Sequence, residues 1–296
     1  MPKNILKRSV TCMFTMAREV IILLLFSIFY GTEQCENFRY TKDVSAPNAI
    51  QIITNVSTES VDYLRGSCVS ECMSKIDCNA IDVCGTYCRL IRGWDSLYTE
   101  QIAATTCQRF QIECAAGQFY DRVLEACIAH DYCDFEADSE FEVSCFLTED
   151  LVDDDGDWIR NTGSTITGSD GPTGPNAAKF GSYYKYMNAA ALSKRDEIMT
   201  LVSSKAFQAR SYCLTFYYHM LGSNMGDLKI FTKNGTQTAV EKWSTSGNQG
   251  DIWIQVPGID LKLDPQTKIL ITAAKRENGD AGDIAVDLFE LWPYPC

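Results

Sequence analysis

Histidine is almost absent from this 296-residue chain, which holds only His130 and His219. Neither belongs to a His-x-x-x-His pair that could hold a metal, and the chain has no Gly-x-Ser-x-Gly motif to carry a serine nucleophile. His219 lies in a stretch that alternates like a β-strand, where a structural role is the common one. We therefore expect no catalytic residues and no enzyme activity.

Basic residues are also scarce. The chain has 26 Lys and Arg against 39 Asp and Glu, which gives a formal net charge of −13. Binding to nucleic acid or to anionic lipid depends mainly on Lys and Arg that neutralise phosphates. The charge balance therefore argues against nucleic acid as a partner.

Apolar runs long enough to cross a membrane are absent too. The longest is Val20–Tyr30, which has 11 residues and follows four basic residues. A spanning helix needs roughly 20 apolar residues, so this run fits the apolar region of a signal peptide, cleaved near Gly31. We expect residues 1–31 to be a signal peptide and the mature protein to be secreted, without membrane insertion. Its removal leaves 22 basic against 38 acidic residues, a net charge of −16.

Cysteine, in contrast, is abundant, with 14 in the chain. A reducing cytosol would keep so many as free thiols, so we expect an oxidising compartment and disulfides. Nine cysteines lie between Cys35 and Cys127, and a domain of about 80 residues needs such staples because its core is small. Nine is odd, and Cys84 is the first candidate for the residue left over, either as a buried thiol or in a bond to another chain.

Two N-glycosylation sequons become relevant once secretion is expected. They are Asn55-Val-Ser57 and Asn234-Gly-Thr236. Both are predicted glycosylation sites.

The second half of the chain has the period-two pattern of antiparallel strands. Leu214, Phe216, Tyr218 and Met220 place apolar groups on one face, and further short runs follow between Gly, Pro, Asn and Asp. This pattern predicts a sandwich or jelly roll. We expect a long surface loop at 161–176. Three tyrosines, Tyr183, Tyr184 and Tyr186, could serve either the core or an exposed contact surface.

An acidic run at 149–157 invites comparison with an EF-hand loop. With Asp153 as the first ligand, the sixth position is Trp158 instead of Gly and the twelfth is Ser164 instead of Glu. We therefore expect a solvated acidic loop.

Residues from Cys133 onward resemble the MAM family, an extracellular module of meprins, neuropilins and receptor tyrosine phosphatases. The matching pieces stand in family order: Cys133-Asp-Phe-Glu136, Asp157-Trp-Ile-Arg160, Cys213–Met220, Ser246–Gly250, Gly282–Asp287 and Cys296. The resemblance implies an antiparallel jelly-roll sandwich with bridges Cys133–Cys145 and Cys213–Cys296. It also implies a structural Ca²⁺ between the first and last strands, with Glu136 and Asp287 as ligands. Leu288 departs from the family, which usually has a second Asp there.

The first half resembles a PAN/apple domain, a small disulfide-rich α+β fold. The evidence is Cys68-x3-Cys72-x5-Cys78 in a predicted helix, where cysteines four residues apart share one face. The resemblance implies Cys72–Cys78, Cys68 with Cys84 or Cys88, and Cys35 with Cys107 or Cys114. Cys114 and Cys127 could instead bridge a connector between the domains.

The expected organisation is a signal peptide at 1–31, a PAN/apple-like domain at 32–113, a connector at 114–131 and a MAM domain at 132–296, so the chain is mainly β. The leading functional hypothesis is a secreted recognition or adhesion protein without a cofactor apart from Ca²⁺. Its partner would be an extracellular protein or a glycan, and the MAM domain could self-associate into a homo-oligomer. A lectin-like glycan binder and a structural component of matrix, mucus or venom are the alternatives.

Overall fold

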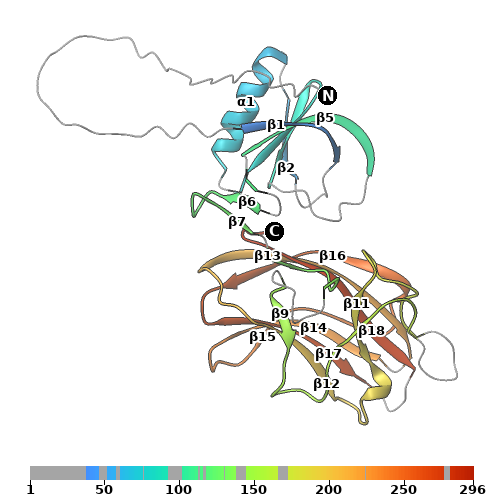
Figure 1. Cartoon of the computed structure of the whole chain (residues 1–296). Helices are drawn as coiled ribbons and strands as arrows, with labels where there is room; N and C mark the ends of the chain where they lie inside the picture. Colours follow the sequence, from blue (N-terminus) through green and yellow to red (C-terminus); the bar gives the residue numbers. More distant parts are fainter. Residues whose placement is uncertain are drawn as a thin grey trace, which may run out of the picture.

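The computed structural model describes residues 38–46, 52–57, 61–75, 77–92, 102–112, 114–115, 118–129, 131–137, 145–165, 173–223, 225–276 and 281–296. The predicted signal peptide, Cys35 and His130 lie outside these ranges. Figure 1 shows a small sheet with a helix, a larger sandwich, and a hairpin between them. Within the described residues, no helix has the length and apolarity to cross a bilayer.

The N-terminal domain is an antiparallel five-stranded sheet with one helix, α1 (Val61–Met73). The strand order is β1-β5-β3-β4-β2, with β1 (Phe38–Ala46), β2 (Ile52–Ser57), β3 (Ala80–Cys84), β4 (Tyr87–Ile91) and β5 (Ile102–Ile112). Leu64, Cys68 and Cys72 recur on one face of α1 and are fully buried against the sheet. The core is small, so its cysteines contribute much of the packing.

Three disulfides staple this domain. Cys68 on α1 bonds Cys88 on β4, and Cys72 bonds Cys78. Cys84 bonds Cys107, so the expectation that Cys84 lacks a partner within the chain is wrong, as is a Cys35–Cys107 bridge. Cys84 ends β3 and Cys107 lies in the middle of the neighbouring strand β5, with Cα atoms 4.4 Å apart, within reach of a bridge.

The connector is a two-stranded hairpin, β6 (Gln118–Asp121) and β7 (Ala126–Ala129). Cys114 bonds Cys127 and fixes the hairpin to the end of the N-terminal domain. This pairing excludes Cys35–Cys114. Because all twelve cysteines of the described residues are bridged, the odd cysteine of 32–296 is Cys35.

The C-terminal half is a sandwich of two antiparallel sheets, which confirms the mainly β prediction. One sheet has the order β10-β11-β18-β13-β16, with β8 also pairing β18: β8 (Asp131–Cys133), β10 (Ile159–Asn161), β11 (Tyr184–Asn188), β13 (Arg210–Gly222), β16 (Gly250–Leu263) and β18 (Gly282–Trp292). The other has the order β15-β14-β17-β12-β9: β9 (Leu147–Glu149), β12 (Ile198–Ser203), β14 (Met225–Asn234), β15 (Val240–Ser246) and β17 (Thr267–Lys275). A short 3-10 helix, η2 (Ala189–Ala191), follows β11.

The apolar alternation of β13 faces the core, as predicted. Leu214, Phe216 and Met220 are at most 1% exposed, and Phe216 stacks on Phe289 of β18 with ring centroids 4.7 Å apart. The outward residues of β13 are buried too, which the alternation does not predict. A segment at 173–183 covers that outer face.

This covering segment corrects the expectation of a surface loop at 161–176 in part, because Thr162, Ser164 and Asn176 are exposed but other residues are not. Residues 166–172 lie outside the described residues, but Thr165, Thr173, Gly174 and Pro175 are buried. Thr173 Oγ1 donates to Asp283 Oδ2 at 2.8 Å, which ties the segment to β18. The low apolar content of these residues did not make them exposed, because hydrogen bonds fix part of the segment against the sheet.

The structure bridges Cys133 to Cys145 and Cys213 to Cys296, the two pairs that the MAM resemblance implies. Gly258 of β16 lies against the second bridge. A Cβ at this position would lie 2.7 Å from Cys296 Sγ and 3.0 Å from Cys213 Sγ. Only glycine lets the strand pass this close to the bridge.

Candidate functional site

Glu136 and Asp287, the predicted calcium ligands, both hold the covering segment. Asp287 is fully buried, and its Oδ2 accepts backbone N–H bonds from Lys179 at 2.9 Å and Phe180 at 3.0 Å. Glu136 Oε1 accepts those of Ser182 and Tyr183 at 2.7 and 2.8 Å. The two carboxylates thus anchor consecutive parts of one segment.

A β-bulge places Asp287 in this position. The register of β18 against β13 shifts between Thr215 and Tyr217, and Leu288 has a φ of 45°. Such bulges redirect side chains. Leu288, where the family usually has Asp, is 3% exposed, and its N–H donates to Asp287 Oδ1 at 2.7 Å.

Burial raises the pKa of Asp287 to about 8, although three backbone N–H bonds lower it, and the nearby charge of Glu136 raises it further. The local environment therefore favours the neutral form near pH 7. A cation between the carboxylates would reverse that preference.

The described residues do not assemble a calcium shell around this pair. Ca²⁺ takes six to eight oxygen ligands. Two backbone carbonyls next to the Glu136 side chain in sequence, those of Phe135 and Glu136 itself, each accept a 2.6 Å hydrogen bond from Arg160. No group of three or more His, Cys, Asp or Glu side chains suited to a metal occurs among the described residues. The calcium site at Glu136 and Asp287 therefore stays a prediction.

His219 is part of the same outer face. It is 1% exposed, its Nε2 lies 3.1 Å from Asp251 Oδ1, and its ring contacts Trp253 edge-on at 5.6 Å. Burial lowers its pKa, although Asp251 raises it. Trp253 Nε1 donates to Ala177 O at 3.0 Å and holds the covering segment from its other side.

The three tyrosines left open by the sequence have separate surroundings. Tyr184 is fully buried; its hydroxyl donates to Gly163 O and accepts from Asn161, and burial raises its pKa to about 12. Tyr183 lies under the guanidinium of Arg160, 3.4 Å from the ring centroid. Tyr186 is half-buried beside Tyr184. Two of the three are thus occupied by contacts within the protein.

The acidic run is less solvated than predicted, because several of its carboxylates hold the neighbouring strand β12. Asp154 Oδ2 accepts from Thr200 N at 2.7 Å, and Asp155 Oδ2 from Ile198 N at 2.9 Å. Leu151 and Val152, in contrast, are 83% and 85% exposed. The run is an anchored loop that presents two apolar side chains.

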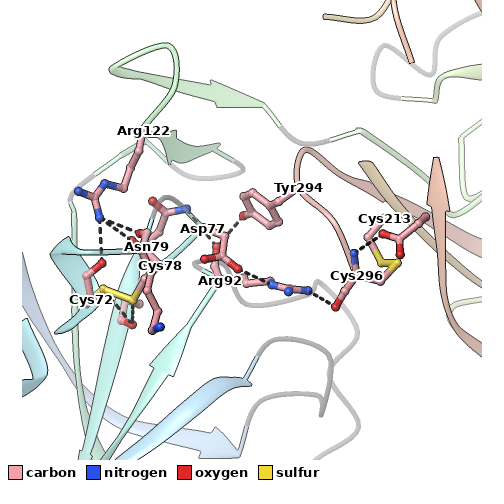
Figure 2. Close-up of polar contacts among 12 residues, drawn as sticks. Cys72, Asp77, Cys78, Asn79, Arg92, Arg122, Cys213, Tyr294 and Cys296 are labelled. Atoms are coloured by element: carbon pink, nitrogen blue, oxygen red, sulfur yellow. Dashed lines mark hydrogen bonds and ion pairs between the residues drawn. A yellow bond between two sulfur atoms is a disulfide. The ribbon is translucent and has the colours of Figure 1, made fainter. Parts of the chain in front are cut away.

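The contacts between the two domains, which we call the junction, were not predicted from the sequence. Arg122, in the turn of the connector hairpin, donates to the carbonyls of Cys72, Met73 and Lys75 at 3.0–3.1 Å and to that of Cys78 at 3.4 Å. Cys72 and Met73 end α1, where helix carbonyls lack partners within the helix, and Lys75 and Cys78 follow it. Figure 2 shows this arginine directed at the Cys72–Cys78 bridge.

The same hairpin also contacts the C-terminal sandwich. Asp121 bonds Arg210 of β13, and that arginine contributes to the lowering of the pKa of Asp121 against the effect of burial. Phe119 is 2% exposed in a cluster with Cys213, Trp292 and Tyr294. A pocket of about 200 Å³ lies beside this contact, lined in part by Phe119, Phe207 and Tyr212.

A second set of contacts between the two domains involves the C-terminal tail (Figure 2). Tyr294 donates its hydroxyl to Arg92 O at 2.6 Å, and Arg92 Nη1 donates to Cys296 O at 3.0 Å. Arg92 is also paired with Asp77 at 3.1 Å. The junction therefore joins Arg92, the residue that follows β4, to Cys296 of the Cys213–Cys296 bridge.

Comparisons with known proteins give a family for the second half. The MAM domain family (meprin/A5/mu) matches residues 133–296. MAM domain-containing glycosylphosphatidylinositol anchor protein 1 from Homo sapiens is 30% identical over 177 residues, which cover 57% of this chain and 18% of that protein. Anchor protein 2 from Rattus norvegicus is 31% identical over 168 residues, which cover 51% and 17%. The chain thus spans less than a fifth of the length of these relatives.

Among solved structures, a cleaved adhesin domain of Lys-gingipain from Porphyromonas gingivalis W83 is 14% identical, covers 54% of this chain and 95% of its own, and has a TM-score of 0.35. A xylan-binding domain from Paenibacillus barcinonensis Xyn10C is 10% identical, covers 58% and 99%, and also has a TM-score of 0.35. The family match begins at Cys133, and the PAN/apple resemblance of the first half stays a prediction.

Proposed function

Because the chain belongs to the MAM domain family through residues 133–296, we propose that it is an extracellular recognition protein of the adhesion type. Its sandwich binds proteins, including second copies of itself, and its N-terminal domain is held at a set orientation by the junction. The family match carries this proposal. The relatives are named as glycosylphosphatidylinositol anchor proteins, whereas we propose that this chain is secreted.

The six disulfides support an extracellular location. They occur in both domains and in the connector, and they include a bridge with a sequence separation of 83. Disulfides persist in oxidising compartments and are rare in the cytosol. The apolar segment Val20–Tyr30 would supply the route of export.

We further propose that the protein is not an enzyme. The buried ionisable side chains of the outer face have structural duties that account for them: His219 contacts Trp253, and Asp287 anchors the covering segment. A general base would instead need access to a substrate. These contacts favour recognition over catalysis.

The anchored acidic loop is the proposed contact surface of the sandwich. Its backbone bonds β12 through Asp150 N to Thr200 O and Asp155 N to Ile198 O, each 2.9 Å. Because its backbone is already fixed, the loop loses little conformational entropy when it binds a partner. Leu151 and Val152 are then available to pack against a partner, with carboxylates around them for polar contacts.

A bead-clustering assay tests this function. Beads coated with the mature, secreted chain should cluster, and the double variant Leu151→Ser, Val152→Ser should cluster several-fold less. Ile252→Ser is the matched control, because Ile252 is 59% exposed on β16, in the other sheet of the sandwich. Clustering that survives the double variant would place the contact elsewhere. Glycan-array binding without clustering would replace the proposal with the lectin-like alternative.

A further inference from the structure

The structure assigns different roles to the two sequons. We infer that Asn55 carries an N-glycan, whereas Asn234 stays unmodified because its amide is a structural clasp between two turns. The inference rests on the proposed extracellular function, since the modification requires passage through the secretory pathway.

Asn234 ends β14 and stands opposite Thr267, the first residue of β17. Its Nδ2 donates to Asp264 Oδ2 at 2.8 Å and to Thr267 Oγ1 at 3.1 Å. A side-chain amide nitrogen has two hydrogens, so both are engaged. Asn234 therefore has no N–H to lose without breaking one of these bonds.

Asp264 is the centre of this clasp. Its Oδ1 also accepts from Gln266 N at 2.9 Å and from Thr267 Oγ1 at 2.8 Å. Gly235, with a φ of 52°, donates its N–H to Gln266 O at 3.2 Å. The turn after β14 and the turn before β17 are thus bonded to each other through Asn234.

Glycosylation would open this clasp. The amide nitrogen attacks C1 of an oligosaccharide carried on a lipid diphosphate. An N–C1 bond forms, the C1–O bond to the lipid diphosphate breaks, and one amide proton leaves to a base of the transferase. The sugar ring would then occupy the place of Asp264 or Thr267, and one of the two hydrogen bonds would be lost. The closed turn and modification at Asn234 therefore compete, because a modified Asn234 would keep only one of the two clasping bonds.

Asn55 has the opposite surroundings. It lies on β2, an edge strand of the N-terminal sheet, directly opposite Arg89 of β4. Asn55 and Ser57 are exposed, whereas Val56 between them packs against the core. No hydrogen bond of the Asn55 amide occurs among the described residues. A glycan at Asn55 would extend into solvent and would also cover an open strand edge, which protects against edge-to-edge association.

The first experiment maps occupancy on the full chain secreted from an N-glycosylating host. Release of glycans by peptide N-glycosidase F in ¹⁸O-water should label Asn55 and leave Asn234 unlabelled. The variant Asn55→Gln should lose the whole gel shift, and Thr236→Ala should keep it. Label at Asn234 in most secreted molecules would overturn the inference, as would label at neither site. In the latter case, recovery of the chain from the medium would show that export, and with it the extracellular proposal, still holds.

The second experiment tests the clasp, with matched variants in the Asn55→Gln background. Asn234→Ala and Thr236→Ala both destroy the sequon, but only the first removes the clasping amide, because Thr236 is exposed. We expect Asn234→Ala to raise the unfolding equilibrium constant roughly tenfold, with Thr236→Ala near wild type. Asn234→Asp should be worse than Asn234→Ala, since it places a carboxylate beside Asp264. Equal destabilisation by Asn234→Ala and Thr236→Ala would contradict the structural role.

Discussion

At the scale of single residues, the outer face of the sandwich depends on a few polar side chains that hold backbone. Asp287 and Glu136 accept four N–H bonds from residues 179–183, and Thr173 and Trp253 hold the same segment through Asp283 and Ala177. A hydrogen bond of this kind contributes roughly 0.5–1.5 kcal/mol, and more where its acceptor is ionised. The segment is therefore held mainly by polar contacts.

Asp287 gives a pH prediction. Its pKa is 3.8 in ordinary surroundings and about 8 in the folded protein, so between these values the native state binds more protons than the unfolded state. Stability should therefore fall as pH rises from about 4 to about 8. Asp287→Asn cannot titrate, so chemical denaturation of this variant should lack that part of the slope. An identical slope in the variant and the wild type would contradict the prediction.

The same measurement tests the predicted calcium site. A cation between Glu136 and Asp287 would hold both carboxylates ionised, so excess Ca²⁺ would flatten the wild-type slope and EDTA would restore it. A slope that is the same in Ca²⁺ and in EDTA would remove calcium from this site. Asp287→Asn serves as the control, because its response to Ca²⁺ reports effects elsewhere.

Some of these residues could be predicted and others could not. Glu136 and Asp287 stand in short motifs of an ordered family pattern, which is why the sequence indicated them. Their role as backbone anchors has no motif, because the partners are N–H groups of a segment more than 100 residues from Asp287. Only the folded chain shows which backbone groups a carboxylate meets.

At the scale of elements, the cysteine-rich sheet shows the limits of counting cysteines. Spacing within one helix indicated that Cys68 and Cys72 share a face, since a helix has a fixed period. Cys78, which was expected in the same helix, lies beyond its end at Met73. The Cys84–Cys107 bridge depends on the pairing of β3 with β5, strands that are distant in sequence. Register between such strands cannot be read from cysteine positions, so the sequence suggested Cys84 as the odd residue.

Removal of the Cys84–Cys107 bridge should destabilise the N-terminal domain. Its sequence separation is 23, and a loop of this size contributes about 3 kcal/mol in the chain-entropy model. The double variant Cys84→Ser, Cys107→Ser should show that loss in urea unfolding. Alkylation of the denatured, unreduced wild type should leave Cys84 and Cys107 unlabelled. Labelling of Cys84 would contradict the bridge.

At the scale of the whole molecule, the junction couples two separately stapled bodies. Its members come from the end of β4, the connector and the C-terminal tail: Arg92, which follows β4, Arg122, Asp121, Phe119 and Tyr294. No local pattern indicated them. An arginine that binds helix-end carbonyls resembles any surface arginine in the sequence, so the domains could be predicted from the sequence but their arrangement could not.

Arg122→Ala should loosen this arrangement. The variant removes the guanidinium that bonds the carbonyls of Cys72 and Met73 at the end of α1 and those of Lys75 and Cys78 beyond it, so the N-terminal domain should sample a wider range of orientations. Small-angle scattering should then show a larger radius of gyration and a broader distance distribution. The control is Arg195→Ala, since that side chain is 66% exposed. Unchanged scattering for Arg122→Ala would show that the tail contacts suffice.

The position of β18 has a consequence for biosynthesis. This strand lies between β11 and β13 and also pairs β8, yet it follows all of them in sequence. During synthesis, the backbone N–H and C=O groups of β11 and β13 that pair with β18 have no strand partner until residues 282–292 have been made. Pairing over such distances is slow. Nascent molecules should therefore depend on chaperones. Oxidation of Cys213 should also be delayed until Cys296 is made, because an earlier disulfide from Cys213 to another cysteine would prevent the sheet from being completed.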